Sequence, residues 1–291
     1  MSSYDLTIGV GQQAIRFDAG PGVLTDLHGW ALQDLTDWMS LSDAKNEIGE
    51  RSQQHGAFDP GRTVRQSALV TATLAYIGSS VADLEEAIRR LTGLAAKPDA
   101  PLRVTFNGAA GATHRDMTNI IVTVPSHHGR SRLSGITIDM TAIDPRAYGD
   151  ETSSTTGVAS PGDGLEFPLE FPVDYGSGGS DGRVRFTNTG TADAYLTFTV
   201  TGGMSEGFSL KRVETGDTIT VSRPINQDDT VTLETYYGTV LLDGLSSLSG
   251  FLTDYQWFQC PPGETCTVQF TPLGETTGTP TLTMTASPAW W

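Results

Sequence analysis

The sequence has few cysteines and no long apolar run, and each shortage excludes a class of protein. Cys260 and Cys266 are the only two cysteines in 291 residues, too few to cross-link both halves of the chain or to build a zinc site alone. Their spacing fits a disulfide across a hairpin and fits two thiols equally well. Because no run of 18 apolar residues and no signal-peptide pattern at the N-terminus occur, we expect no secretion signal and no membrane insertion.

Basic residues are scarce as well. The chain has 18 Lys and Arg against 34 Asp and Glu, a formal charge of -16, and a surface of this sign repels a phosphate backbone, so we expect no nucleic-acid binding. Residues 1–150 carry 13 basic and 17 acidic residues, a net charge of -4, whereas residues 151–291 carry 5 and 17, a net charge of -12. The difference indicates two domains with unlike surfaces.

Helical periodicity is convincing only over residues 79–97. There Leu84, Ile88 and Leu91 recur at helical spacing, and Ser80 stands where an N-cap is expected. Elsewhere 33 Gly and 15 Pro separate short segments in which apolar residues alternate with polar ones, a pattern typical of β-strands. The predicted fold class is therefore mainly β with one helix.

The strand patterns divide the chain into two parts. Residues 1–149 form a first β domain that contains the helix, and residues 150–164 are polar without a periodic apolar set, which predicts a linker. Residues 165–291 then show strands at intervals expected for a β-sandwich. The segment LEFPLEFP (165–172) predicts the opening edge strand of this domain, since its two prolines cannot donate to a ladder.

No segment predicts catalysis or a bound cofactor or metal. On an extended chain Glu166 and Glu170 are about 13 Å apart, too far to flank one glycosidic bond. The segment 203–207 matches G-x-S-x-G, but the residues after Ser205 read as a strand and all five histidines precede it, whereas a nucleophile elbow needs a helix and a downstream base. The pair His127-His128, with His114, lacks ligands at metal-binding spacing.

Aromatic residues of the second half are candidates for contact with a glycan or a protein. They are Tyr236, Tyr237, Trp257, Trp290 and Trp291. Aromatic rings stack on sugars but more often fill a core, while a tryptophan pair at 290–291 is costly to expose. A carbohydrate-binding module that contacts host cell-wall glycans through the sandwich is therefore an alternative function.

The order of the motifs resembles the distal tail protein family of long-tailed siphophages, whose members include minor tail proteins. The resemblance extends over nearly the whole chain. It rests on HGAFDPGR (55–62), the helix DLEEAIRRLTGL (83–94), ITIDMTAIDPRAYG (136–149), GLEFPLEFP (164–172), VRFTNTGTADAYLTFTVTG (184–202), TVTLETYYGTVLLDG (230–244) and PPGETCTVQF (261–270). The cysteines of WFQCPPGETC depart from the pattern, so the resemblance implies no role for them.

The resemblance implies a structural protein of the virion at the distal end of the tail, made in the host bacterial cytoplasm, and no enzyme. The N-terminal domain would be a β-barrel-like belt that closes a homohexameric ring, and the C-terminal domain a galectin-like β-sandwich that faces outward. Implied partners are the tail tube protein, the tail hub or tail-associated protein, and peripheral receptor-binding proteins. The small charge of the first half suits burial between neighbouring subunits.

Overall fold

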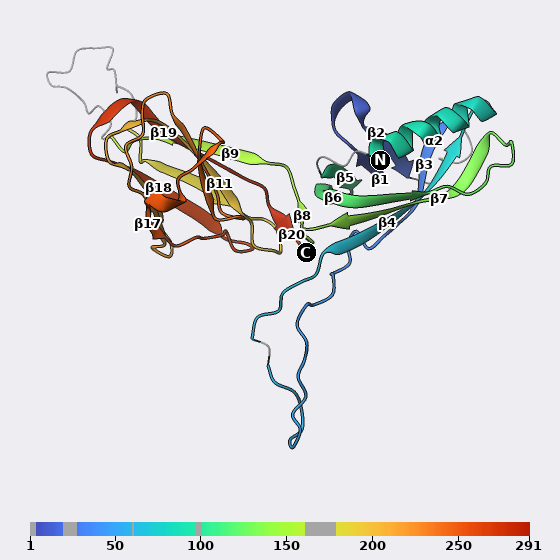
Figure 1. Ribbon diagram of the computed structural model, residues 1–291, viewed down its shortest axis with the longest axis horizontal. Helices are drawn as coiled ribbons and strands as arrows, with labels where there is room; N and C mark the ends of the chain where they lie inside the picture. The colour runs from blue at the N-terminus through green and yellow to red at the C-terminus, as the bar shows by residue number, and fades with distance from the viewer. Residues whose placement is uncertain (1–3, 20–27, 60, 97–100, 161–178) are drawn as a thin grey trace, which may run out of the picture. The chain divides into compact units, whose positions relative to one another are not determined.

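A computed structural model describes residues 4–19, 28–59, 61–96, 101–160 and 179–291 (Figure 1). The chain divides into two compact units, one that ends at Gly149 and also takes in Trp291, and one from Asp150 to Trp290. They are called the first and the second unit below. Within the described residues, no helix is both long and apolar enough to cross a membrane.

The first unit is a closed, mainly antiparallel barrel with one helix in its described residues. Its elements are β1 (Tyr4–Ile8), the short 3-10 turn η1 (Gly11–Gln13), β2 (Ile15–Ala19), β3 (Gly29–Thr36), β4 (Ala68–Ile77), α2 (Val81–Ala95), β5 (Leu102–Gly108), β6 (Gly111–Thr123), β7 (Arg132–Ala142) and β8 (Ala147–Tyr148). The strand order β6-β5-β1-β2-β3-β4-β7 closes through pairing of β7 with β6. One seam is parallel, since in the described part of the chain β2 and β3 pair at Asp18 and Ala31.

Alternation along β4 explains the barrel core. Ala68, Val70, Ala72 and Leu74 are buried, as the sequence pattern predicts, while Leu69 is 59% exposed. Successive side chains of a strand point to opposite faces, so every second residue enters the interior. Residues from β1, β2, β5, β6 and β7 complete the same apolar cluster.

The predicted helix is confirmed as α2. The Ser80 side chain accepts a hydrogen bond from the Asp83 amide at 3.1 Å, and Leu84, Leu91 and Leu94 are its buried residues. The Asp83 carboxylate in turn accepts bonds from the Ser79 amide and hydroxyl at 2.8 and 2.9 Å and from the Tyr76 hydroxyl at 3.0 Å. These bonds, that from the Ser79 amide first, lower the pKa of Asp83, and they fix the start of the helix to the end of β4.

The second unit is a β-sandwich. Its elements are β9 (Thr152–Gly157), β10 (Arg183–Thr187), β11 (Leu196–Met204), β12 (Gly207–Arg212), β13 (Thr218–Val221), β14 (Thr230–Glu234), β15 (Thr239–Leu242), β16 (Ser246–Ser247), the 3-10 turn η2 (Ser249–Phe251), β17 (Leu252–Tyr255), β18 (Thr265–Leu273), β19 (Thr276–Ala286) and β20 (Ala289–Trp290). Five strands form the sheet β10-β18-β12-β13-β17, and six form the sheet β16-β15-β14-β11-β19-β9. Phe198, Phe208 and Phe270 are fully buried among the core residues.

The expected linker over 150–164 is wrong for Thr152–Gly157, which is the edge strand β9. This strand pairs with β19 in register from Thr152 opposite Ala286 to Gly157 opposite Thr281. Of its side chains only Thr156 is buried, so the strand needs no periodic apolar set and escapes a hydrophobic pattern. The strand predicted at LEFPLEFP (165–172) lies outside the described residues.

Candidate interaction surfaces

A long hairpin arm extends from the barrel between β3 and β4 (Figure 1). Its two sides are joined by isolated bridges, Ala44 with Arg65 and Glu50 with Ala57. Backbone bonds such as Lys45 N to Val64 O at 2.7 Å, together with side-chain bonds, hold the sides together. In its described residues this hairpin has no sheet packed on either face (Figure 1), and an isolated hairpin is only marginally stable. Its extended shape is therefore suited to contact with another molecule.

Apolar side chains of the arm point into solvent in this single chain. Exposed fractions are 77% for Met39, 67% for Ile48 and 64% for Phe58, and Leu41 and Val64 are about half exposed. The Arg51 guanidinium lies 5.3 Å from the centroid of the Phe58 ring. Exposed apolar residues concentrated on one projecting segment mark a contact surface. HGAFDPGR (55–62) is a motif of the family resemblance, but no pattern in the sequence predicts the arm.

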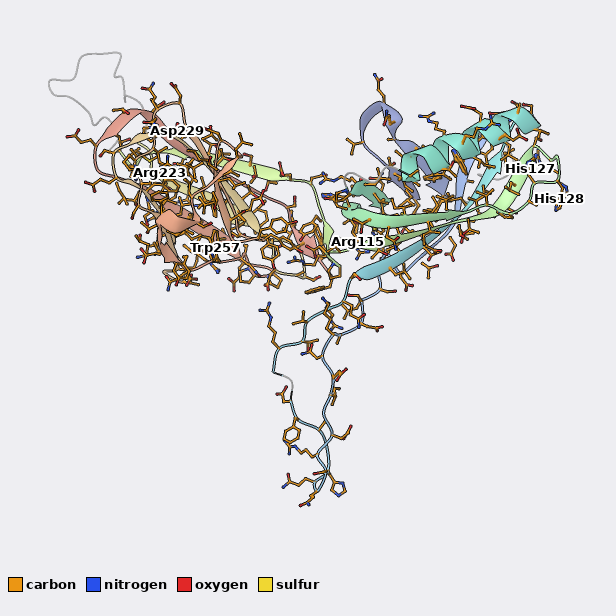
Figure 2. All side chains as sticks on the ribbon, viewed as in Figure 1. Arg115, His127, His128, Arg223, Asp229 and Trp257 are labelled. Atoms are coloured by element: carbon orange, nitrogen blue, oxygen red, sulfur yellow. The ribbon has the colours of Figure 1, made fainter. Side chains whose placement is uncertain are left out.

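The base of the arm is fixed by Arg115 of β6 (Figure 2). Its Nη1 donates to the Trp38 carbonyl at 2.7 Å, and its guanidinium lies 5.0 Å from the Trp38 ring centroid. The Trp38 indole N–H donates to the Thr113 hydroxyl at 3.2 Å. Burial lowers the pKa of Arg115 to about 10, and the negative charge of Asp144 partly offsets this by raising it. The buried cation thus ties the first residues of the arm to the barrel wall.

The structure brings two of the five predicted aromatic residues, Tyr236 and Tyr237, into contact, and a third, Trp257, lies beside the next residue, Gly238. The Tyr236 ring makes edge-to-face contacts with Tyr195 and Tyr237 at centroid distances of 4.8 and 4.6 Å, and the Trp257 ring lies against Gly238, at the turn between β14 and β15. Tyr237 is 71% exposed and Tyr236 40%. Tyr195 belongs to this group and is not among the predicted contact residues, although it precedes an alternating strand.

The other two predicted aromatic residues lie elsewhere along the chain. Trp290 is partly buried at the end of β20, and Trp291 is 45% exposed. Trp291 also interacts with other residues. Their role in contact with a glycan or a protein stays a prediction.

The G-x-S-x-G segment is a corner between the two sheets. The chain leaves β11 at Met204 and enters β12 at Gly207, a strand of the other sheet, so the strand-to-helix geometry of a nucleophile elbow is absent here. The Ser205 hydroxyl accepts a hydrogen bond from the Glu275 amide at 2.8 Å. Gly207 has φ +96°, and a Cβ there would lie 1.9 Å from the Val221 carbonyl oxygen.

This corner yields a stability prediction. Gly207→Ala is expected to lower the free energy of unfolding by about 3 kcal/mol, because a positive φ costs about 1–2 kcal/mol and the Val221 carbonyl must also move. Ser205→Ala removes one exposed hydrogen bond and should cost about 1 kcal/mol or less. Urea unfolding, with hydrogen exchange of peptides from β11 to β13, measures both. A larger loss for Ser205→Ala would contradict a purely structural corner.

His114, His127 and His128 do not form a metal site in the described part of the chain. His127 Nε2 lies 3.7 Å from a Glu85 oxygen, whereas the His114 ring packs near Tyr148 at 6.2 Å. Among the residues that the structure describes, no group of three or more His, Cys, Asp or Glu is placed to bind a metal ion.

Cys260 and Cys266 are free thiols, both buried. The Cys260 thiol donates to the Glu264 carbonyl at 3.4 Å. A hydrogen bond between the two side chains lowers the pKa of Cys260 and raises that of Cys266. In this structure the cysteines are therefore core residues beside the start of β18.

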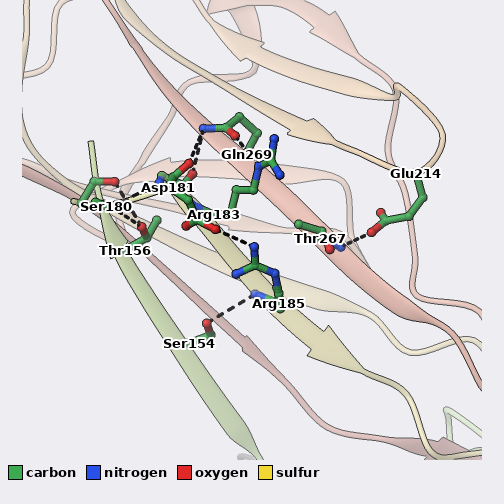
Figure 3. A network of polar contacts seen from close by, with 11 residues as sticks. Ser154, Thr156, Ser180, Asp181, Arg183, Arg185, Glu214, Thr267 and Gln269 are labelled. Atoms are coloured by element: carbon green, nitrogen blue, oxygen red, sulfur yellow. Dashed lines mark hydrogen bonds and ion pairs between the residues drawn. The ribbon is translucent and has the colours of Figure 1, made fainter. Parts of the chain in front are cut away.

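A polar network covers part of the five-stranded sheet (Figure 3). The Asp181 carboxylate accepts a bond from the Arg185 guanidinium at 2.5 Å, which is the main cause of its lowered pKa. The Arg183 guanidinium donates to the Gln269 side chain at 2.8 Å, across the β10–β18 pairing. All these groups are exposed or half-exposed, so they stabilise the surface weakly.

Most of the second unit is similar to a domain of phage tail proteins. Residues 189–288 match the family model of the siphovirus-type tail component, C-terminal domain. The predicted relationship to phage distal tail proteins is thereby confirmed at the level of this domain.

Solved structures extend the likeness in fold to the whole chain. The crystal structure of SPP1 Dit, described as a paradigm of the hub adsorption apparatus in phages that infect Gram-positive bacteria, matches with a TM-score of 0.63 at 13% identity and covers 98% of this chain and 99% of its own. The phage p2 baseplate in its activated conformation, solved with strontium and with calcium, contains chains that match with TM-scores of 0.53 and 0.51 at 11% and 10% identity, covering 97% of both chains. No curated protein sequence matches this chain.

Proposed function

We propose that this chain is a structural component of the tail tip of a siphophage, where six copies form a ring between the tail tube and the tip hub. The family of the second unit and the fold shared with a hub protein support the tail assignment. The arm is the argument for a ring. Its apolar side chains Met39, Ile48 and Phe58 are exposed in a single chain, and a neighbouring copy could cover them.

A ring needs a heterologous interface, in which one surface of a subunit meets a different surface of the next and the rotation closes. An arm that projects from one side of the barrel meets this requirement, since it can lie on a neighbour while the subunit's own barrel receives the arm of the preceding copy. The exposed Leu69 and Ile121 on the barrel strands β4 and β6 offer apolar surface for such an arm.

In this proposal the second unit is a scaffold for peripheral host-recognition proteins. Its net charge of -12 over residues 151–291 suits a surface that stays in solvent. The partners are other copies of the chain, the tail tube protein and the tail hub protein, and the protein has no catalytic role.

Electron microscopy of the purified full-length protein, alone and mixed with the tube and hub proteins of the same phage, tests the proposal. Sixfold rings, alone or on addition of either partner, are expected. A monodisperse monomer that binds neither partner would rule out the ring function, and rings of another closed symmetry would correct the copy number alone.

A further inference from the structure

The outward face of the six-stranded sheet in the second unit is an array of hydroxyl groups. In β11, Phe198 and Val200 enter the core, so Thr197, Thr199 and Thr201 lie on the other face. The neighbouring strands repeat this alternation, and their threonines are in register with those of β11.

The central row shows the regularity of the array. Thr199 stands opposite Thr232 on one side and Thr283 on the other, and Thr283 stands opposite Thr155. Adjacent strands lie about 4.8 Å apart, so over β9, β19, β11 and β14 the row presents one hydroxyl per strand at that interval. It ends at β15, where Leu241 stands opposite Thr232. This interval is close to the length of one sugar residue in an extended, equatorially linked polysaccharide.

The hydroxyls keep hydrogen-bonding capacity for a ligand. Thr155 pairs with Thr283 at 2.9 Å and Thr201 with Thr281 at 2.8 Å between the oxygen atoms. A hydroxyl has one donor and two acceptor lone pairs, so each such pair retains one donor and further acceptors. Donors and acceptors fixed side by side on a sheet match the hydroxyl groups of a sugar.

Aromatic rings stand at one end of the same face. Tyr195 and Tyr236 continue the alternation of the threonines of β11 and β14 beyond Thr197 and Glu234, and their rings are in contact at 4.8 Å. Tyr237, 71% exposed, packs edge-to-face on Tyr236. The negative face of an aromatic ring attracts the C–H groups of a pyranose, so stacking and hydrogen bonding are available on one surface.

The charge of the face selects among glycans. Glu234 belongs to the row of Thr197 and Thr285, and no Lys or Arg occupies an outward position of the described strands β9, β19, β11, β14 and β15. Anionic polymers would meet only a carboxylate and a unit of net negative charge, which disfavours them. Neutral chains meet no such repulsion.

We propose that this face of the six-stranded sheet binds a neutral polysaccharide laid across the strands, with one sugar stacked on the tyrosines and the following sugars hydrogen-bonded to the threonine rows. The proposal assigns the binding surface to the Thr155, Thr199, Thr232 and Thr283 row and to Tyr236 and Tyr237. It is independent of ring formation, because every contributing residue belongs to the second unit.

The full-length protein should be titrated with neutral polysaccharides of different linkage, namely dextran, a soluble β-glucan and a galactan, with alginate as the anionic comparison. Isothermal titration calorimetry should give saturable binding of at least one neutral chain and none of alginate. Thr199→Arg and Tyr237→Ala should each weaken that binding tenfold or more. Because the Tyr237 side chain is exposed, Tyr237→Ala is the variant least able to disturb folding.

Thr271→Arg is the matched control, since Thr271 is an exposed threonine of β18 in the other sheet, and it should bind as the unmodified protein does. The proposal fails if no neutral chain binds saturably, if alginate binds as tightly, or if Thr271→Arg weakens binding as much as Thr199→Arg. A surface that serves only to dock a protein would give the first of these results.

Discussion

Replacing Asn188 with alanine is expected to lower the free energy of unfolding of the second unit by about 4 kcal/mol. The side chain is fully buried, and its Nδ2 donates to the carbonyls of Ala192 at 2.7 Å and Cys260 at 2.9 Å. Its Oδ1 accepts from the amides of Gly190 at 3.0 Å and Ala289 at 3.3 Å. Each buried group left without a partner costs about 1–3 kcal/mol, and urea unfolding of the full chain measures the sum.

Two further variants separate hydrogen bonding from volume. Asn188→Asp keeps the shape but turns the donor side into an acceptor that faces two carbonyls, so it should be about as damaging as alanine. Asn226→Ala is the control, because Asn226 is exposed and its Nδ2 bonds only to Asp229, at 3.0 Å. It should cost about 1 kcal/mol or less. Equal losses at 188 and 226 would show that the buried bonds contribute little.

Asn188 also shows why a local motif does not reveal its own importance. The segment NTGTADA (188–194) has the composition of a turn, and it connects β10 to β11. The partners Cys260 and Ala289 are far along the chain, so no local spacing brings them to residue 188. The close approach at Gly190, where a Cβ would lie 1.8 Å from the Ala289 carbonyl oxygen, depends on the same distant contact.

Elements with a one-sided apolar pattern could be predicted from the sequence. The helix α2 and strands such as β4 and β7 have a buried face that recurs at the period of the element, so pattern and structure agree. The sandwich strands β11 and β19 agree for the same reason. Threonines alternate with apolar residues in the sequences of these strands. The register between strands, which aligns single threonines into rows, exists only in the folded sheet.

Elements without a buried face could not be predicted in this way. The edge strand β9 is polar on both faces, and even its buried residue Thr156 is polar, so its pairing with β19 leaves no apolar signature. The arm has exposed apolar residues at irregular positions, since no surface of its own chain determines their spacing. Of the candidate aromatic residues, Tyr236 and Tyr237 meet because they are neighbours in sequence, whereas Tyr195 joins them only through pairing of β11 with β14.

The double variant Ile48→Asp and Phe58→Asp is expected to abolish ring assembly while the isolated chain stays folded. Both side chains lie on the arm and are about two-thirds exposed, so charged replacements disturb little within one chain. If the arm is buried on a neighbouring copy in the ring, each residue contributes about 1.5–3 kcal/mol to that interface. Losing both weakens each subunit contact by roughly 10²- to 10⁴-fold. Electron microscopy and analytical ultracentrifugation, at the concentration where the unmodified protein assembles, would detect this as loss of rings.

Leu245→Asp is the control for the arm variant, because Leu245 is 88% exposed but belongs to the second unit. It should assemble as the unmodified protein does, and all three proteins should give the same circular dichroism spectrum. Rings from the double variant at unchanged concentration would show that the arm lies outside the subunit interface, and the closure would then rest on the barrel strands alone. Loss of rings in both variants would instead point to a general effect of added negative charge on a chain that already carries a formal charge of -16. In that case added salt, which screens the repulsion between subunits, would restore the rings.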